Sequence, residues 1–348
     1  MSLIKVNKQR KDHMDYIYEV KQLINNKCFG ELMNFTNFSL CELRSTGSLR
    51  KILKNNNIMV TKYVIDNMCS INSLSPNGWS LIHSLLYYSQ DTSLIKYFVY
   101  KYHISLESAT KDREKPIHFA CQVATVETVK FLMDNGVDLE SKTIEEVRPI
   151  HSACYSGKIE IVQFLVDRKV DLEATTINQL RPIHVVCQNA NFDIVQLLTH
   201  EGVNLETATI EGRKPIHFAC QYKSLEIMQF LISKGVNLET QCISTMRPIH
   251  YACRYGTLDI IQFLINKEVN LEATTEWGWR PIHVVCYYQT YEIIKYFLSK
   301  NIILNTKINR YDGAYAEYGV KDLLLMSEKL SLDHKEELLC IISERENE

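Results

Sequence analysis

The sequence lacks an excess of charge of either sign. It has 39 Lys and Arg residues against 41 Asp and Glu residues, so the formal net charge is −2. Proteins that bind nucleic acids or membrane surfaces carry strong positive fields, so the charge of the whole chain favours neither class. The first 75 residues are slightly basic, with 11 basic against 6 acidic residues. That modest excess is typical of a solvated helical face.

Long apolar runs are absent as well. No stretch of 18 consecutive apolar residues occurs, so we expect no membrane insertion. The first residues contain no apolar segment of the length that a secretory signal needs. In a large chain without such a signal, the 11 cysteines indicate free thiols in the cytoplasm or the nucleus rather than disulfides.

Short catalytic motifs are also missing. The sequence contains no G-x-x-x-x-G-K-[ST], no G-x-G-x-x-G, no H-E-x-x-H and no G-x-S-x-G. An enzymatic site would have to lie in residues 1–75 or in the C-terminal tail, and neither segment shows a recognisable one. We therefore expect no enzymatic activity, no cofactor and no metal.

What the sequence does contain is a repeat of 33 residues. A Pro-Ile-His-x-x-Cys phrase recurs at this spacing without any insertion, at Pro116, Pro149, Pro182, Pro215, Pro248 and Pro281. A Leu-Glu pair recurs on the same period. A strict period of this length indicates a solenoid, in which each unit packs only against its neighbours.

One unit is predicted to be a helix, a turn, a second helix and a hairpin-like loop. Proline suits the first turn of a helix, where its missing N–H is not needed. The second helix is strongly apolar, as in the segment "IEIVQFLV". Gly136, Gly202 and Gly235 follow that helix, where a left-handed residue often ends it.

This unit resembles the ankyrin repeat. "PIHSAC", the apolar second helix and "GVNLE" match that family in order and spacing over about residues 76–313. The resemblance implies an all-α ankyrin-repeat solenoid that binds partner proteins. We expect a helical leader over residues 1–75, the repeat array over 76–313 and a helical capping segment over 314–348.

Two departures from the family pattern recur in every copy. The threonine before proline is a basic residue here, and the late asparagine is glutamate. The basic residues are Lys115, Arg148, Arg181, Lys214, Arg247 and Arg280, and the acids are Glu107, Glu140, Glu173, Glu206, Glu239 and Glu272. Because the two ladders alternate in phase, we expect a lattice of ion pairs rather than a track for phosphates. The family's usual Thr–His contact is not expected.

Each phrase also places a histidine and a cysteine three residues apart, on one helix face. Both are zinc ligands, but a zinc site needs about four ligands, and neighbouring helices lie about 8–10 Å apart. A catalytic site is singular, whereas this pair recurs six times. We therefore expect structural roles: the histidines tie hairpin to helix, and the cysteines fill the core. They are His118, His151, His184, His217, His250 and His283, with Cys121, Cys154, Cys187, Cys220, Cys253 and Cys286.

The two ends of the array are less regular, as terminal repeats usually are. Residues 77–110 form a degenerate copy, in which Leu81 replaces proline and Leu86 replaces cysteine. In the leader, apolar spacing predicts a helix over residues 16–24 and two more around residues 49–53 and 63–68. The C-terminal segment keeps a turn at Asp312-Gly313 and two helical runs.

Positions that vary between otherwise uniform copies are the candidates for partner contact. By the family resemblance, hairpin tips and the ends of the first helices line the binding surface. Tyr, Trp, Met and Arg are enriched in such surfaces. The candidates are Ile144, Val147, Tyr155, Ile177, Leu180, Ile210, Arg213, Tyr222, Met246, Arg254, Tyr255, Trp277, Trp279, Tyr287 and Tyr288. The isoleucines, which include Ile243, are equally compatible with packing on one another between hairpins.

The function predicted from these features is that of a non-enzymatic, monomeric scaffold that binds one or more partner proteins and no nucleic acid. The alternative is an ankyrin module that binds a nucleotide or nucleic acid near residues 253–288. In that case Trp277, Trp279 and Tyr255 would stack on bases while Arg254 and Arg280 neutralise phosphates.

Overall fold

The computed structural model describes residues 48–54, 58–67, 71, 74–89, 91–309 and 317–346. The chain divides into two compact units, Met1–Val170 and Asp171–Glu348. The helix expected over residues 16–24 lies outside the described residues.

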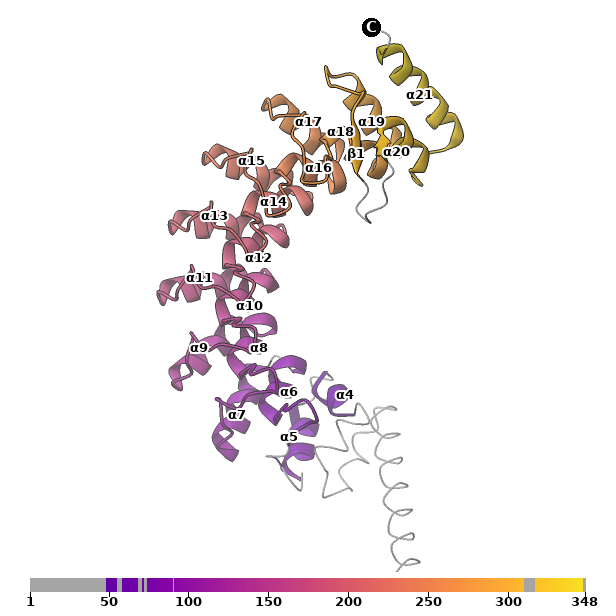
Figure 1. The fold of residues 1–348 in the computed structure, drawn as a ribbon. Helices are drawn as coiled ribbons and strands as arrows, with labels where there is room; N and C mark the ends of the chain where they lie inside the picture. Colours follow the sequence, from indigo (N-terminus) through magenta and orange to yellow (C-terminus); the bar gives the residue numbers. More distant parts are fainter. Residues whose placement is uncertain are drawn as a thin grey trace, which may run out of the picture. The chain divides into compact units, whose positions relative to one another are not determined.

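The N-terminal unit is a stack of helix pairs (Figure 1). Its described helices are α4 (Ser48–Lys54), α5 (Ile58–Asp66), α6 (Leu81–Tyr88), α7 (Thr92–Tyr102), α8 (Pro116–Val123), α9 (Val126–Asp134), α10 (Pro149–Ser156) and α11 (Ile159–Asp167). The first helices pack on one another in the order α4, α6, α8, α10, and the second helices in the order α7, α9, α11. Helices α4 and α5 confirm the two helices predicted around residues 49–53 and 63–68, although Met68 itself lies outside the described residues.

The C-terminal unit continues the same arrangement. Its helices are α12 (Pro182–Gln188), α13 (Phe192–His200), α14 (Pro215–Gln221), α15 (Leu225–Ser233), α16 (Pro248–Tyr255), α17 (Leu258–Asn266), α18 (Pro281–Tyr288), α19 (Tyr291–Leu298), α20 (Val320–Met326) and α21 (Leu332–Glu346). Helices α12, α14, α16, α18 and α20 pack in one row, and α21 packs on α19 and α20. The two helical runs predicted for the C-terminal segment are therefore present.

The sequence explains where these helices begin and end. Proline stands at the first position of α8, α10, α12, α14, α16 and α18. Side chains such as Asn191 and Ser224 accept N–H groups at the start of the second helices. Gly136, Gly202 and Gly235 follow the second helices with φ of 82°, 80° and 83°, which confirms the predicted left-handed ends.

The core lies between the two rows of helices and consists mainly of small and branched apolar side chains, with buried phenylalanines such as Phe98 and Phe297. The isoleucine after each proline and the cysteine four residues later are at most 1% exposed in all six copies. Burying an isoleucine side chain contributes about 1.5–3 kcal/mol, so each copy adds a similar increment to the stack. The 33-residue period thus corresponds to a repeated packing unit.

Two short strands were not expected from the sequence. Strand β1 (Lys307–Asn309) pairs antiparallel with β2 (Glu317–Gly319), with Ile308 opposite Tyr318. They lie on either side of the boundary that we expected at residue 313. Because three residues a strand carry almost no periodic signal, sequence patterns do not reveal such a pair. Among the described helices, none combines the length and the apolar content that crossing a bilayer requires.

Candidate functional site

The six repeated histidines are buried at the starts of the first helices. In each, Nδ1 accepts the N–H of the basic residue before proline, at 3.0–3.2 Å. Because Nδ1 accepts, the proton is on Nε2, which in His250 donates to the carbonyl oxygens of Ala273 (3.1 Å) and Trp279 (3.3 Å) in the following hairpin. Burial lowers the pKa of His217, His250 and His283 to about 4. These imidazoles are neutral at pH 7.

The six repeated cysteines are fully buried free thiols. Burial raises the pKa of each well above the usual range for cysteine. In the part of the chain that the structure describes, no three His, Cys, Asp or Glu side chains gather where a metal ion can bind. A thiol with a raised pKa is a poor nucleophile, so the chemistry of these residues is that of small apolar side chains.

The repeated basic and acidic residues form the expected lattice of ion pairs. Each Lys or Arg before proline pairs with the glutamate eight residues upstream, as in Lys214–Glu206 at 2.8 Å and Arg280–Glu272 at 2.5 Å. In the C-terminal unit, the other oxygen of each glutamate accepts a backbone N–H of the next repeat, at 2.7–2.9 Å. The two departures from the family pattern are therefore halves of one contact that joins successive repeats.

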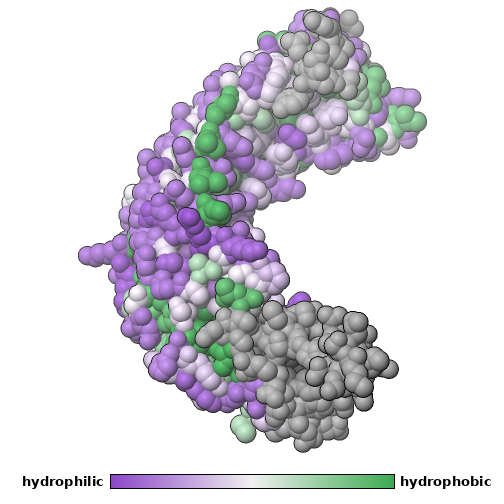
Figure 2. All heavy atoms as spheres, turned by 60° about the horizontal axis from the view of Figure 1, so that its bottom comes forward, coloured by the Kyte–Doolittle hydropathy of each residue, from purple (hydrophilic) through white to green (hydrophobic). Residues whose placement is uncertain are grey.

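The hairpin tips expose an isoleucine in four copies. Ile177, Ile210 and Ile243 of the C-terminal unit, and Ile144 at the same position in the N-terminal unit, are 52–70% exposed. The N–H of Ile210 donates to Asn178 O at 3.0 Å, and that of Ile243 to Glu211 O at 2.9 Å. Figure 2 shows a narrow row of strongly apolar residues on an otherwise largely hydrophilic face. Such exposed apolar rows mark interaction surfaces.

The other predicted contact residues differ in how available they are. Tyr155 and Tyr222 are exposed, whereas Val147 and Leu180 are half-buried. Arg213 stacks on the rings of Phe218 (4.1 Å) and Tyr251 (5.1 Å), and its side chain is only 17% exposed. Intramolecular contacts thus hold most of the Arg213 side chain.

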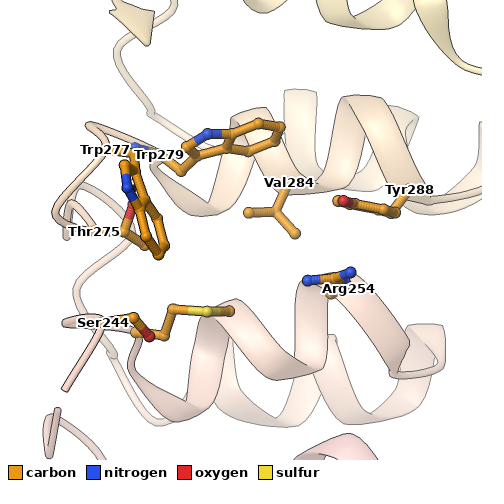
Figure 3. A pocket seen from close by; sticks show the side chains of 8 residues that line it. Ser244, Arg254, Thr275, Trp277, Trp279, Val284 and Tyr288 are labelled. Carbon is orange, nitrogen blue, oxygen red and sulfur yellow. Dashed lines mark hydrogen bonds between the residues drawn. The ribbon is translucent and has the colours of Figure 1, made fainter. Parts of the chain in front are cut away.

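The structure brings several of the predicted residues together around a pocket of about 520 Å³ in the C-terminal unit (Figure 3). The pocket is lined by Ser244, Met246, Arg254, Thr275, Trp277, Trp279, Val284 and Tyr288. The two indoles stand at one end, and Arg254 and Tyr288 face each other at the other end. We call this the Trp279 pocket. Sequence reasoning missed Ser244, Thr275 and Val284, because these residue types carry no signal of binding.

The hairpin that carries the two tryptophans is held by its own backbone. Thr275 N–H donates to Trp279 O at 2.9 Å, and Trp279 N–H donates to Thr275 Oγ1 at 3.1 Å. Gly278 adopts φ +78°, a backbone conformation that residues other than glycine rarely adopt. The backbone that carries both indoles is therefore fixed before any ligand arrives, which lowers the entropy cost of binding.

Among the described residues, a single charged residue lines this aromatic pocket. The Trp279 ring lies 6.0 Å from Tyr287 and 6.4 Å from Tyr288. The Arg254 guanidinium stacks 4.7 Å from the centre of the Tyr288 ring and 5.0 Å from that of Tyr255. Within the described residues Arg254 forms no ion pair, unlike the basic residues of the lattice.

A second aromatic cluster was also missed. It consists of Trp79, Tyr87 and Tyr88, in the degenerate copy over residues 77–110. Trp79 and Tyr88 line a smaller pocket of about 390 Å³, which we call the Trp79 pocket. The spacing from Trp79 to His83 equals that from Trp279 to His283, and this signal was available in the sequence.

Comparison with known proteins agrees with the fold. A family model described as ankyrin repeats (3 copies) matches residues 49–143, 85–176, 150–242 and 236–312. The chain belongs to the ankyrin-repeat family. Ankyrin repeats are protein-binding modules. The first match begins at residue 49 and so covers α5 and all of α4 except Ser48.

One solved structure similar to this ankyrin-repeat chain is that of the human ASB11 ankyrin repeat domain. It is 21% identical, with a TM-score of 0.57, and the alignment covers 66% of this chain and 98% of that one. At this identity the likeness concerns the fold alone. No curated protein matches the sequence.

Proposed function

We propose that this ankyrin-repeat protein is a non-enzymatic scaffold whose partner protein docks on the hairpin tips and the first-helix ends of the C-terminal unit. The observation that carries the proposal is the Trp279 pocket beside the exposed isoleucine tips. Trp, Tyr and Arg dominate the binding energy of protein interfaces, and pockets that bury a partner side chain concentrate it. A monomer in the cytoplasm or the nucleus fits the buried free thiols.

Replacing the two indoles tests the proposal. We expect Trp277→Ala combined with Trp279→Ala to weaken capture of the partner from native lysate more than tenfold, since each truncated hot-spot residue costs about 2 kcal/mol or more. The matched control is Leu332→Ala, which removes an exposed apolar side chain of α21 outside the pocket. Unchanged partners for a folded double variant would contradict the proposal.

The alternative, a nucleotide or nucleic-acid site, finds less support in the geometry. Arg280 is paired with Glu272, and Arg254 is the one positive charge among the described residues that line the pocket. Binding of a phosphate chain requires several such charges and depends steeply on salt. In filter-binding titrations with RNA and DNA at low and high salt, we expect no salt-sensitive retention. Tight, salt-dependent retention would instead favour the alternative.

A further inference from the structure

Residues 75–88 repeat the site of residues 275–288, at a distance of 200 residues along the chain. Both segments combine a glycine and a tryptophan in the hairpin with two consecutive tyrosines at the end of the following helix. None of the five copies between them does so, since Glu114, Val147, Leu180, Arg213 and Met246 stand at the tryptophan position. The combination is thus confined to these two places.

The hairpins before the two helices have the same hydrogen bonds. Ser75 N–H donates to Trp79 O at 2.9 Å, and Trp79 N–H donates to Ser75 Oγ at 2.9 Å, as Thr275 and Trp279 do in the other copy. Gly78 adopts φ +79°, against +78° for Gly278. Each tryptophan is therefore held by the same short, closed turn.

The ring geometry also agrees. Trp79 lies 5.5 Å from Tyr87, edge to face, and 6.4 Å from Tyr88, at 41°. Trp279 lies 6.0 Å from Tyr287, edge to face, and 6.4 Å from Tyr288, at 35°. The first tyrosine of each pair is exposed (41% for Tyr87, 37% for Tyr287) and the second is half-buried. The two clusters thus offer similar aromatic surfaces.

The two pockets are lined at the same positions and each has one charge. Positions 75, 77, 79, 84 and 88 line the first, and positions 275, 277, 279, 284 and 288 line the second. Among the described residues, Arg50 of α4 is the only charged residue that lines the first pocket, and Arg254 of α16 is the only one that lines the second. The two arginines enter from different positions of their helices, so it is the chemistry that recurs rather than a copied residue.

On the basis of the proposed function, we propose that the Trp79 pocket is a second copy of the Trp279 pocket and that both bind the same kind of partner segment. That segment is an extended peptide with a bulky apolar side chain and a carboxylate within about three residues of it. The apolar side chain contacts the tryptophan and tyrosine rings, and the carboxylate pairs with the arginine. One chain therefore holds two such segments.

We infer the carboxylate of the ligand from the free-energy cost of shielding the arginine guanidinium from water. A purely apolar ligand would shield the guanidinium from water without giving it a counter-ion, and a cationic ligand would add repulsion. The Arg254 guanidinium is 4.7 Å from the Tyr288 ring, which is 6.4 Å from the Trp279 ring. An extended peptide advances 3.3–3.6 Å per residue, so two or three residues bridge the arginine and the indole.

The two pockets are expected to differ in their affinity for the peptide segment. Asn77 stands where the second pocket has Trp277, and Ser84 stands where it has Val284. The first pocket is also smaller, about 390 Å³ against 520 Å³. With less apolar surface to cover the ligand, the Trp79 pocket binds the weaker of the two segments.

The three tryptophans of the chain allow a direct test, because all three lie in these two pockets. The full chain is labelled with 5-fluorotryptophan, and its ¹⁹F resonances are assigned with Trp79→Phe and Trp277→Phe. The probe is a pool of capped pentapeptides with one Phe or Leu and one Glu, one to three residues apart, in a Gly/Ser background. Matched pools carry Gln or Lys in place of Glu.

We expect the Glu pool to shift the Trp79 resonance and the Trp277 and Trp279 resonances in two separate saturable titrations, the Trp79 titration being the weaker. At both sites the affinity of the Glu pool exceeds that of the Gln pool at least tenfold, and the Lys pool has the lowest affinity. Arg50→Gln abolishes the preference for Glu at Trp79 alone, and Arg254→Gln abolishes it at Trp277 and Trp279 alone.

The contrary outcomes are distinct. Shifts confined to Trp277 and Trp279 overturn the second site and leave the proposed function standing. Equal affinity for the Glu and Gln pools overturns the carboxylate requirement. No shift at any of the three tryptophans overturns both this inference and the use of the Trp279 pocket in the proposed function.

Discussion

At the scale of single residues, the burial of the repeated histidines makes the stability of the fold depend on pH. Each imidazole accepts one backbone N–H, and where its Nε2 contacts are resolved, as in His118 and His250, the Nε2 proton is donated to the next hairpin. Protonation of Nδ1 removes the acceptor and adds a charge where solvent is excluded. Burial accordingly lowers the pKa of His217, His250 and His283 to about 4, against about 6.5 in an unfolded chain.

We therefore expect the free energy of unfolding to fall as the pH is lowered from about 6.5 to 4. In this window the unfolded chain binds protons that the folded chain excludes, and above it both states are neutral. The loss amounts to about 1–2 kcal/mol per histidine at pH 5. Urea denaturation at pH 7, 6 and 5 measures it, with His200→Gln, at an 85% exposed side chain, as the control variant. A urea midpoint that stays constant from pH 7 to 5 contradicts this account.

The glutamates are the second group of residues with a cross-repeat role. One oxygen of Glu239 pairs with Arg247, and the other accepts the N–H of Asn270 at 2.8 Å. The carboxylate thereby joins the start of its own repeat's helix to the hairpin of the next. An amide oxygen can replace only one of these two acceptors.

We expect Glu239→Ala to lower the free energy of unfolding by about 1–2 kcal/mol and Glu239→Gln to lower it less, because the amide still accepts the backbone N–H. Chemical denaturation at neutral pH provides the measurement. Glu127→Gln is the matched control, since its pair with Lys96 is an exposed surface contact worth about 0–1 kcal/mol. Equal losses for Glu127→Gln and Glu239→Ala would show that the second acceptor contact adds nothing.

At the scale of elements, each hairpin holds one backbone position at positive φ. Residues at one hairpin position have positive φ in several copies, including Arg113 (59°), Glu146 (58°) and Thr245 (54°). Glycine takes that position at Gly78 and Gly278, before the tryptophans. The two glycines share a conformation but differ in their surroundings.

We expect Gly78→Ala to destabilise the fold more than Gly278→Ala. Both substitutions strain a residue at φ near +78°, at a cost of about 1 kcal/mol. A Cβ at Gly78 would also lie 2.9 Å from the backbone nitrogen of Lys111, whereas at Gly278 the nearest atom is 3.7 Å away. Thermal unfolding of the two single variants measures the difference, and a larger loss for Gly278→Ala would refute the steric explanation.

At the scale of the whole molecule, the helix pairs within each unit pack on their neighbours in sequence. In the C-terminal unit, α16 contacts α14 and α18. In such an array stability is close to a sum over repeats and nearest-neighbour contacts. A local loss of packing therefore weakens nearby repeats more than distant ones.

We expect Ile261→Ala, which empties a fully buried position of α17, to cost about 2–5 kcal/mol and to raise amide hydrogen exchange first in α15–α19. Helices α6–α9 of the other unit keep their protection. Hydrogen exchange with mass spectrometry of the full chain locates the change. For the matched variant Val162→Ala, in α11, we expect the increase in hydrogen exchange to occur first in α9–α11. A uniform rise over both units for either variant would contradict nearest-neighbour coupling.

The sequence by itself determined the ankyrin-repeat fold and the order of its helices, because a strict 33-residue period can bury its apolar faces only by stacking. It also indicated five of the residues that line the Trp279 pocket, Met246, Arg254, Trp277, Trp279 and Tyr288. Only the tertiary structure decided which of them meet around one cavity, that each lattice glutamate of the C-terminal unit also binds the next repeat, and that β1 pairs with β2. These contacts join residues that are far apart in the sequence. They depend on the spatial geometry of the hairpins, which a period along the chain does not specify. The match between Trp79 and Trp279 lies between the two cases. The sequence shows the shared spacing, but only the structure shows that each tryptophan lines a pocket at the same positions.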